Sequence, residues 1–324
     1  MKKRRLLPGI LAGAFMIVLI LDNQRALWAA SQAMELCIRT VIPAMLPFLF
    51  LTTILCTSWG GQRLPFLAPF SAFLGIPRGM EALLIPGFLG GYPLGAKAIS
   101  DYYEKGLLSR ETALRLLSFL SNAGPAFFIG ILSACFPDRW MVFSLWGIHI
   151  LSAFLVAALQ SVKESARCKG EETALSLPHV MESSLKALGL ICGWILCFRV
   201  LSAELEHWIL WRLPDWLQAL IIGLLELTNG CSKLTAVASV EIRYLLAAGL
   251  SGFGGLCVLM QTHSVLGSLP LSSYLLGKTL QALFSLLMAY FVIRGAYPVI
   301  FIIIMVSAAL LLQNRGRKIL RTGV

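Results

Sequence analysis

The chain has few charged residues, and this scarcity excludes most classes of soluble protein. Only 13% of its 324 residues are Asp, Glu, Lys or Arg, whereas 58% are hydrophobic. Soluble domains usually contain about 25% charged residues. The mean hydropathy of +0.80 is correspondingly high. Between the hydrophobic stretches no segment is long enough for a soluble domain of useful size, so the composition predicts a polytopic membrane protein.

Motifs for catalysis and for metal binding are also absent. The chain has only four histidines, without the spacing of metal ligands, and its eight cysteines include no C-x-x-C pair. It contains no G-x-S-x-G or H-E-x-x-H motif and no glycine-rich phosphate loop. We therefore expect buried structural thiols, no bound metal, no cofactor and no enzymatic activity.

Acidic residues are outnumbered by basic ones, and the net charge is +11. Such a charge suits nucleic-acid binding, but here the basic residues gather at the two ends, at 2–5 and 315–321, and in short connectors. This is the distribution that orients membrane helices, with basic loops kept in the cytoplasm. The sequence predicts a multi-pass cell-membrane protein with both termini in the cytoplasm and no nucleic-acid partner.

The hydrophobic stretches predict an all-α architecture, because about 20 helical residues span a bilayer. We expect N-terminal helices and an amphipathic segment at 1–78, a first repeat at 79–160, a cytoplasmic loop at 161–182, a second repeat at 183–294, and a last helix with a basic tail at 295–324. The first repeat comprises a hairpin at 79–105, a broken helix at 112–136 and a helix at 140–162. The second comprises a helix at 184–201, a hairpin at 216–240, a broken helix at 243–266 and a helix at 279–293.

Two motifs in the first half of the chain have counterparts in the second half. GFLGGYPLGAK at 87–97 and GLLELTNGCSK at 223–233 both open with Gly and close with Lys, 136 residues apart, and LSNAGP at 120–125 returns as LSGFGG at 250–255. Placing the charges by the positive-inside rule makes the two hairpins enter from opposite sides. The sequence thus predicts inverted repeats with re-entrant hairpins and broken helices, which is typical of transporters.

A family resemblance adds to this interpretation. The motifs GFLGGYPLGAK, DYYEKG and LLSFLSNAGPAFFIG resemble the Gate, or nucleoside-recognition, membrane family, and more narrowly the YlbJ-type (SpoVV-like) sporulation integral membrane proteins. The resemblance covers residues 40–310, and LLELTNG in the second half is a shorter match. It implies a fold related to concentrative nucleoside transporters. It also implies export of dipicolinic acid from the mother cell toward the forespore, across the outer forespore membrane.

The hairpins and the breaks are the expected substrate site. Irregular backbone survives in hydrocarbon only where protein or a water-filled cavity satisfies it, and the N-termini of half-helices attract carboxylates. The candidate binding residues are Gly91, Tyr92, Pro93, Gly95, Lys97, Ser121, Asn122, Gly124, Glu226, Thr228, Asn229, Lys233 and Ser251. Gln261, Thr262 and His263 are further cavity-lining candidates. His149 lies in a long apolar helix, where a histidine is more often a hydrogen-bonded interior residue than a ligand.

Several of these residues have two open interpretations. Lys97 and Lys233 either supply charge to the site or serve at a surface, and Lys233 is the stronger candidate because its run is otherwise uncharged. Glu226 either pairs with Lys233 or binds a coupling cation or proton, because a carboxylate in such a run costs roughly 3 kcal/mol unless it is paired or hydrated. Thr228, Asn229, Ser121 and Asn122 either cap half-helices or contact substrate.

Taken together, these patterns favour a transporter of a small organic anion. A nucleoside-type solute transporter and a non-transporting membrane scaffold for spore assembly are the alternatives. The expected partners are the lipid bilayer and the small anion, with a homo-oligomer or other sporulation membrane proteins left open.

Overall fold

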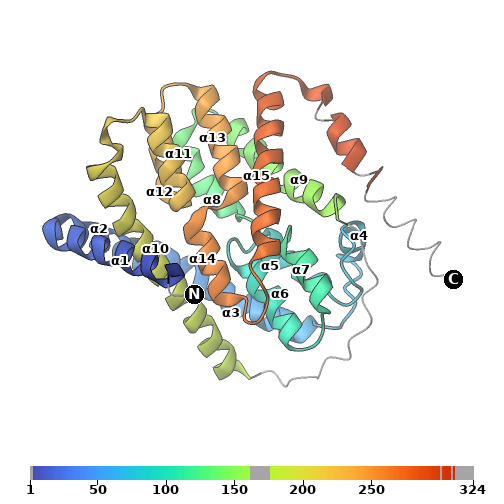
Figure 1. The fold of residues 1–324 in the computed structure, drawn as a ribbon. Coiled ribbons are helices and arrows are strands. Elements are labelled where there is room, and N and C mark those ends of the chain that lie inside the picture. The colour runs from blue at the N-terminus through green and yellow to red at the C-terminus, as the bar shows by residue number, and fades with distance from the viewer. Residues whose placement is uncertain (1–2, 161–175, 300, 308, 311–324) are drawn as a thin grey trace.

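The computed structural model describes residues 3–160, 176–299, 301–307 and 309–310 (Figure 1). All regular structure in this described part is helical. Most of the basic connector expected at 161–182, and the basic tail from 311 onward, lie outside the described residues.

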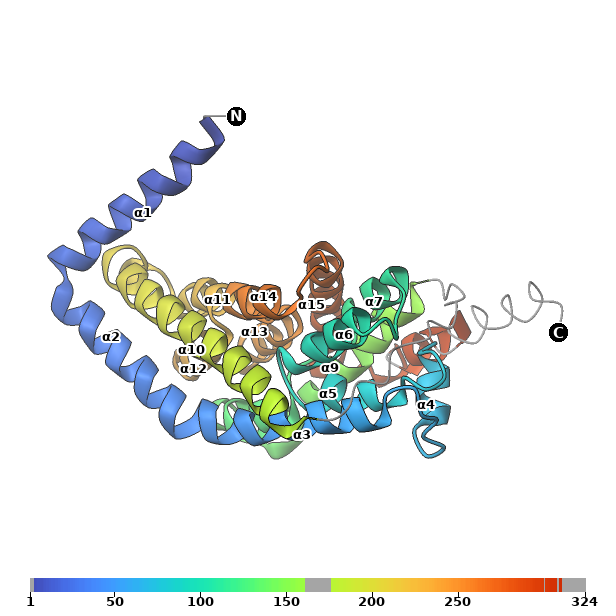
Figure 2. The same cartoon turned by 90° about the horizontal axis from the view of Figure 1, so that it is seen from below.

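The N-terminal region forms one short helix and one long, nearly continuous helix. Helix α1 spans Lys3–Leu21, and α2 (Asn23–Leu36) continues through a π turn at Cys37–Val41 into α3 (Ile42–Trp59). The amphipathic segment expected within 1–78 is therefore part of the same helix as the apolar span that follows it. Pro43 and Pro47 lack backbone N–H groups, and the wider π turn lies just before them. Figure 2 shows α2 and α3 running beside α10 (Leu177–Trp208), against which both pack.

The first half of the chain then folds in the order hairpin, broken helix, helix. A 3₁₀ turn at Glu81–Leu83 leads into α5 (Leu84–Phe88), and α6 (Leu94–Glu104) returns. Helix α7 (Arg110–Leu117) is capped by the Ser109 hydroxyl, which accepts from Thr112 N at 3.3 Å. Residues 118–124 are not helical, after which α8 (Pro125–Gly130), a 3₁₀ turn at Leu132–Cys135 and α9 (Arg139–Ala158) follow. Pro125 starts α8 because its fixed φ suits a first helical position.

The second half repeats this order. Helix α10 is followed by a 3₁₀ turn at Leu210–Arg212, and α11 (Asp215–Leu225) packs against α12 (Leu227–Lys233). After a 3₁₀ turn at Leu234–Ala236, α13 (Val240–Phe253) ends at Gly254 and α14 (Gly255–Val265) begins. Gly254 and Gly255 have φ of 87° and 82°, which only glycine adopts readily, so the chain breaks there. Helix α15 (Ser272–Ile293) then lies against α13 and α9, and a further apolar helix covers Tyr297–Ser307.

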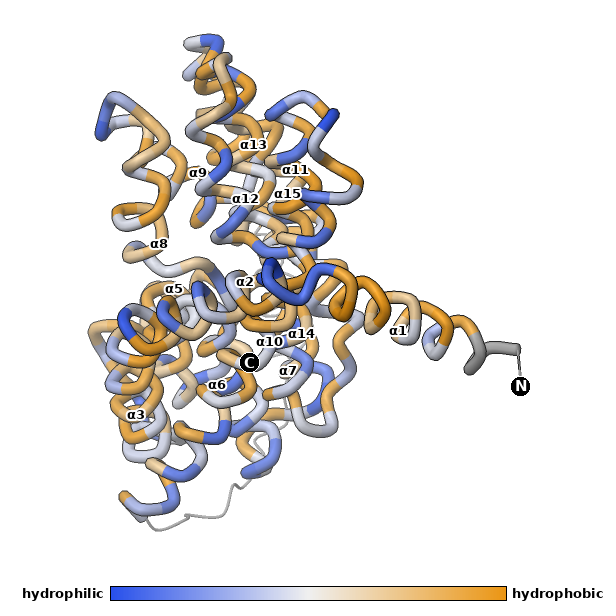
Figure 3. Tube along the Cα trace, turned by 90° about the vertical axis from the view of Figure 1, so that its left-hand side faces the viewer, coloured by the Kyte–Doolittle hydropathy of each residue, from blue (hydrophilic) through white to orange (hydrophobic). Residues whose placement is uncertain are grey.

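The described chain contains five helices long and apolar enough to cross a bilayer: Asn23–Trp59, Arg139–Ala158, Leu177–Trp208, Val240–Val265 and Ser272–Ile293. Their surfaces carry large exposed apolar side chains, such as Leu276 at 61% and Leu283 at 56%. Figure 3 shows hydrophobic residues along most of the helices, with hydrophilic stretches concentrated near the connections. An all-α membrane protein, as the composition predicts, accounts for this apolar exterior.

Two large apolar clusters, and a smaller one around Leu49 and Leu188, hold the described bundle together. One joins α9, α13 and the C-terminal part of α15 around Leu145, Tyr244 and Met288. The other joins α5, α6 and α7 around Ile99, Leu116 and Leu120. The first break, between α7 and α8, contributes to both clusters through Leu120 and Ala123. The break is therefore fixed between them.

Candidate functional site

A fully buried lysine, Lys278 on α15, lies where the first break meets α9 and α15. Its relative exposure is 0%, and its Nζ donates to Gln281 Oε1 at 2.6 Å and to Asn122 Oδ1 at 3.4 Å. The ammonium also lies 5.1 Å from the ring centre of Tyr92 and 5.6 Å from that of Tyr274. Among the described residues, no Asp or Glu carboxylate lies within 4.0 Å of it. Lys278 is thus a fully buried amine whose partners are amides and aromatic faces.

Small residues on and beside α15 allow Lys278 to lie next to the first break. A side chain at Gly277 would fall on the backbone of Ser118, so the absence of one lets α15 lie directly against residues 118–122. Gly252 allows the same close approach on the other side, because a Cβ there would lie 2.8 Å from Ala282 Cα. The side chains of Lys278 and Gln281, one turn apart, can therefore both reach Asn122.

Asn122, His149, Lys278 and Gln281 form one hydrogen-bonded unit, called here the central polar cluster. Asn122 Nδ2 donates to Gly87 O at 3.0 Å and to Phe119 O at 2.8 Å, while its Oδ1 also accepts from Gln281 Nε2 at 2.9 Å. Gln281 Nε2 donates to His149 O at 3.0 Å. His149 Nε2 accepts from Ala123 N at 3.1 Å, which makes this an interior histidine with a satisfied ring nitrogen. The cluster ties the first hairpin, the first break, α9 and α15 together.

The tip of the first hairpin connects this cluster to the second break. Tyr92, which follows Gly91 at φ 84°, donates its hydroxyl to Ser251 O at 3.2 Å. A Cβ on Gly254 would lie 3.5 Å from the Tyr92 ring, so the ring packs against the interruption between α13 and α14. Both breaks and one hairpin tip therefore converge on the cluster.

Three buried hydroxyl groups beside the cluster have no hydrogen-bond partner in the described structure: Ser121 Oγ, Thr262 Oγ1 and Tyr274 Oη. The side chains of Thr262 and Ser121 lie within reach of the Tyr274 hydroxyl, but outside good hydrogen-bond geometry. Three hydroxyl groups next to the Lys278 amine are donors of the kind that bind the oxygens of an anion.

The structure brings some of the predicted site residues to this place. Asn122 belongs to the central polar cluster, Ser121 is one of the unpaired hydroxyls, and Tyr92 and Ser251 make the contact between the halves. Gly91 and Gly124 approach each other, since a Cβ on Gly124 would lie 3.2 Å from Gly91 N. Pro93 is the residue before α6, and Gly95 allows α6 to lie against the backbone of Leu120.

Other predicted residues lie in the second hairpin or have local partners. Glu226 caps α12, because its Oε1 and Oε2 accept from Thr228 N at 3.0 Å and from Asn229 N at 2.7 Å. Lys233 pairs with Glu206 at 3.0 Å rather than with Glu226. Lys97 pairs with Asp101 at 2.7 Å. The Lys97 side chain is 9% exposed and that of Lys233 is 28% exposed, which reverses the expected order of the two as interior charges.

Sequence reasoning missed Lys278, Gln281 and Tyr274. Lys278 separates two runs without charged residues, at 244–277 and 279–293. From the sequence it therefore marks only the boundary between two predicted helices. The usable signal was an isolated charge between two membrane-length stretches, which by itself marks a functional position. Thr262 was among the cavity-lining candidates.

Comparison with protein-family models, with curated proteins and with solved structures found no match.

Proposed function

We propose that this protein is a membrane transporter for a small organic anion, bound beside Lys278. The observation that carries the proposal is the fully buried amine of Lys278, which has no acidic neighbour in the described structure and which a bound anion would stabilise in its charged form. An ionisable group in a membrane interior is costly, and it persists where it serves a substrate or ion pathway. A carboxylate would meet both the Lys278 amine and the hydroxyls of Ser121, Thr262 and Tyr274, which make no well-formed hydrogen bond in the described structure.

An inverted-repeat architecture is the second part of the proposal. Gly87 of the first hairpin faces Leu120 of the first break, and Gly223 of the second hairpin faces Leu250 of the second break; in both cases a Cβ would lie 2.5 Å from the leucine side chain. These pairs stand at matching places in the two duplicated motifs. In addition, the hydroxyl oxygens of Ser152 on α9 and Ser285 on α15 are 2.8 Å from each other, although the two residues are separated by 133 positions in the sequence.

The contact between Ser152 and Ser285 supports a two-fold relation between the halves. Equivalent residues of two symmetric units meet on the axis that relates them. The offset of 133 falls between the 130 of the break motifs and the 136 of the hairpin motifs. The central polar cluster includes residues of α9 and α15 close to this contact, which is where inverted-repeat transporters bind their substrates.

Dipicolinic acid is the first substrate to test, because the family resemblance of the sequence implies it. A neutral nucleoside is the second candidate. The Tyr92 and Tyr274 rings beside the amides of Asn122 and Gln281 would suit a base that stacks and forms hydrogen bonds. The two substrates differ in what they require of Lys278, since only the anion requires a compensating charge.

The test is binding and uptake by the purified protein in proteoliposomes, with labelled dipicolinate and a neutral nucleoside. For Lys278→Gln we expect at least about tenfold weaker dipicolinate binding, which corresponds to about 1.4 kcal/mol. Lys278→Arg should not fully restore it, because a planar fork does not replace a compact ammonium group. Lys186→Gln, at an exposed position of α10, is the matched control.

Each alternative predicts a different outcome. Unchanged dipicolinate binding by Lys278→Gln would reject the anion site. A loss confined to the nucleoside would favour the nucleoside transporter. Absence of flux of either solute through the wild-type protein, reconstituted at normal yield, would favour a membrane scaffold.

A further inference from the structure

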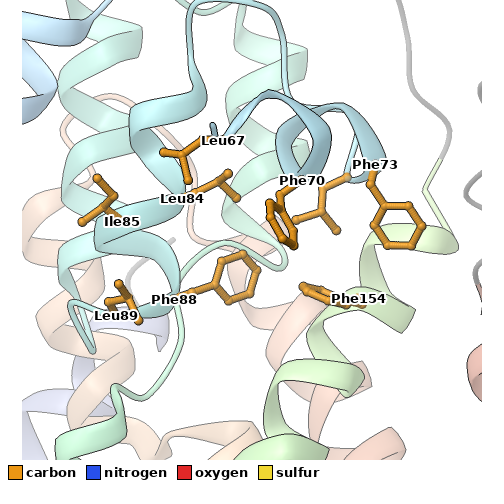
Figure 4. A pocket seen from close by; sticks show the side chains of 9 residues that line it. Leu67, Phe70, Phe73, Leu84, Ile85, Phe88, Leu89 and Phe154 are labelled. Carbon is orange, nitrogen blue, oxygen red and sulfur yellow. The ribbon is translucent and has the colours of Figure 1, made fainter. Parts of the chain in front are cut away.

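An apolar cavity of about 210 Å³ lies between α4 (Ala68–Phe73), α5 and α9. Its lining differs in chemistry from the central polar cluster. Its walls, called here the aromatic pocket, are Leu67, Phe70, Phe73, Leu74, Leu84, Ile85, Phe88, Leu89 and Phe154 (Figure 4). The Phe154 ring packs edge-on against Phe73 and Phe88, with centroid separations of 6.3 and 5.5 Å. No side chain in these walls can form a hydrogen bond, so the pocket does not suit a polar solute.

The pocket reaches the outer surface of the bundle. Phe70 is 62% exposed and Leu89 is 50% exposed, although both line the cavity. In a membrane protein such an opening faces acyl chains rather than water. A hydrocarbon chain is thus the ligand that the walls accept.

The segment that forms the outer wall has positive charge at both of its ends. Residues 60–80 read GGQRLPFLAPFSAFLGIPRGM and include Arg63 and Arg78 but no acidic residue. Gly61 N donates to Gly79 O at 3.0 Å and closes this segment into a loop, so that both arginines lie next to the closure. Both are exposed.

A half-buried arginine holds the loop in place. Arg115 of α7 donates to Leu74 O at 2.7 Å and to Gly75 O at 3.1 Å, and these are the carbonyls at the end of α4. The carbonyls that a short helix leaves unpaired are thereby satisfied by a rigid donor. The wall of the pocket is fixed before any ligand binds, which lowers the entropic cost of binding.

We propose that the aromatic pocket holds one acyl chain of an anionic phospholipid, whose phosphate binds Arg63 and Arg78. Burial in the pocket gives an acyl chain little advantage over the surrounding bilayer, because both are apolar. Selectivity therefore comes from the headgroup. Two arginines near the membrane surface should enrich an anionic over a zwitterionic lipid by about tenfold or more.

The experiment is photo-crosslinking of the full-length protein in nanodiscs. Lipids with a diazirine in the acyl chain and either a phosphatidylglycerol or a phosphatidylcholine headgroup are compared, and labelled residues are mapped by mass spectrometry. With phosphatidylglycerol we expect labelling within 67–74 and 84–89, about tenfold above phosphatidylcholine. Arg63→Gln with Arg78→Gln should reduce this labelling to the phosphatidylcholine level, whereas Arg110→Gln, an exposed arginine outside the loop, should not.

A second variant tests the cavity itself. Leu89→Trp adds bulk at the half-exposed mouth of the pocket, and it should remove labelling within 67–74 for both lipids. Equal labelling by the two lipids in the wild type would overturn headgroup recognition. Unchanged labelling in Leu89→Trp, or labelling only outside the pocket, would overturn acyl-chain binding there. None of these results depends on whether the protein transports an anion.

Discussion

The two hairpins stand at corresponding places in the chain, yet their tips differ in chemistry. At the first hairpin, the tip residue Tyr92 reaches the second break and lies over the Lys278 ammonium. At the second hairpin, the turn carries Glu226, whose carboxylate caps the following helix, and the hairpin ends at Lys233, which pairs with Glu206. Both hairpins rely on glycine for close packing, at Gly95 and Gly230.

This difference separates the packing that the two hairpins share from the polar groups that differ between them. The glycine contacts recur because two helices of a short hairpin must approach closely, whichever chemistry the hairpin carries. The charged groups of the second hairpin have local partners, whereas the Lys278 amine has no acidic neighbour in the described structure. A locally paired charge contributes to structure, and an ionisable group without such a partner is a candidate for ligand binding.

The largest effect should come from the shared glycine packing. A Cβ at Gly230 would fall on the backbone of Gly223, which cannot move aside as a side chain could. Gly230→Ala should therefore destabilise the protein by about 3 kcal/mol, the upper part of the range for overpacking. Gly189→Ala is the control, since Gly189 is exposed within α10 and a Cβ there meets nothing within 4 Å. Thermal melting in detergent measures both; equal melting temperatures would mean that the second hairpin is not tightly packed.

An intermediate loss of stability is expected from Glu226→Gln. The amide keeps one acceptor oxygen, so one of the two N–H groups, of Thr228 or Asn229, loses its partner and the charge at the helix N-terminus is removed. Loss of a cap typically costs about 1 kcal/mol. We expect a lower melting temperature with wild-type dipicolinate uptake per folded molecule.

Uptake and stability distinguish the two roles open to Glu226. Lost uptake with an unchanged melting temperature would assign it to a coupling cation or proton. The control is Glu241→Gln, an acidic residue in the first turn of α13 whose side chain is 56% exposed.

The all-α membrane fold could be predicted from the sequence, and so could some of the residues that the structure brings together in the candidate site. The hairpins and breaks could be predicted because they need particular residues: Gly91, Gly254 and Gly255 adopt positive φ, and Pro125 starts a helix. The π turn that joins α2 to α3 was not foreseen, since the hydropathy of 23–59 does not reveal whether its segments are collinear.

The centre of the site depended on packing that no local pattern encodes. Lys278 meets Asn122 because Gly277 lets α15 touch the first break, and these residues are 156 positions apart. Asn122, Ser121 and Tyr92 were predicted because they stand in the interruptions themselves. Tyr274 and Gln281 lie inside a regular helix, where their side chains resemble ordinary interior residues until the neighbouring helices are known.

The smallest effect should come from Lys233→Gln, and it tests the comparison most directly. Lys233 and Glu206 are each about one-third exposed, and a pair of this kind contributes about 0–1 kcal/mol because solvent screens it. We expect dipicolinate affinity to change by less than about twofold, or about 0.4 kcal/mol, against the much larger loss in Lys278→Gln. Glu206→Gln is the control for the broken pair, since it removes the same interaction and leaves the lysine. If Lys233→Gln weakened dipicolinate binding as much as Lys278→Gln while Glu206→Gln did not, the second hairpin would supply charge to the substrate, and the contrast between a locally paired Lys233 and a ligand-binding Lys278 would be wrong.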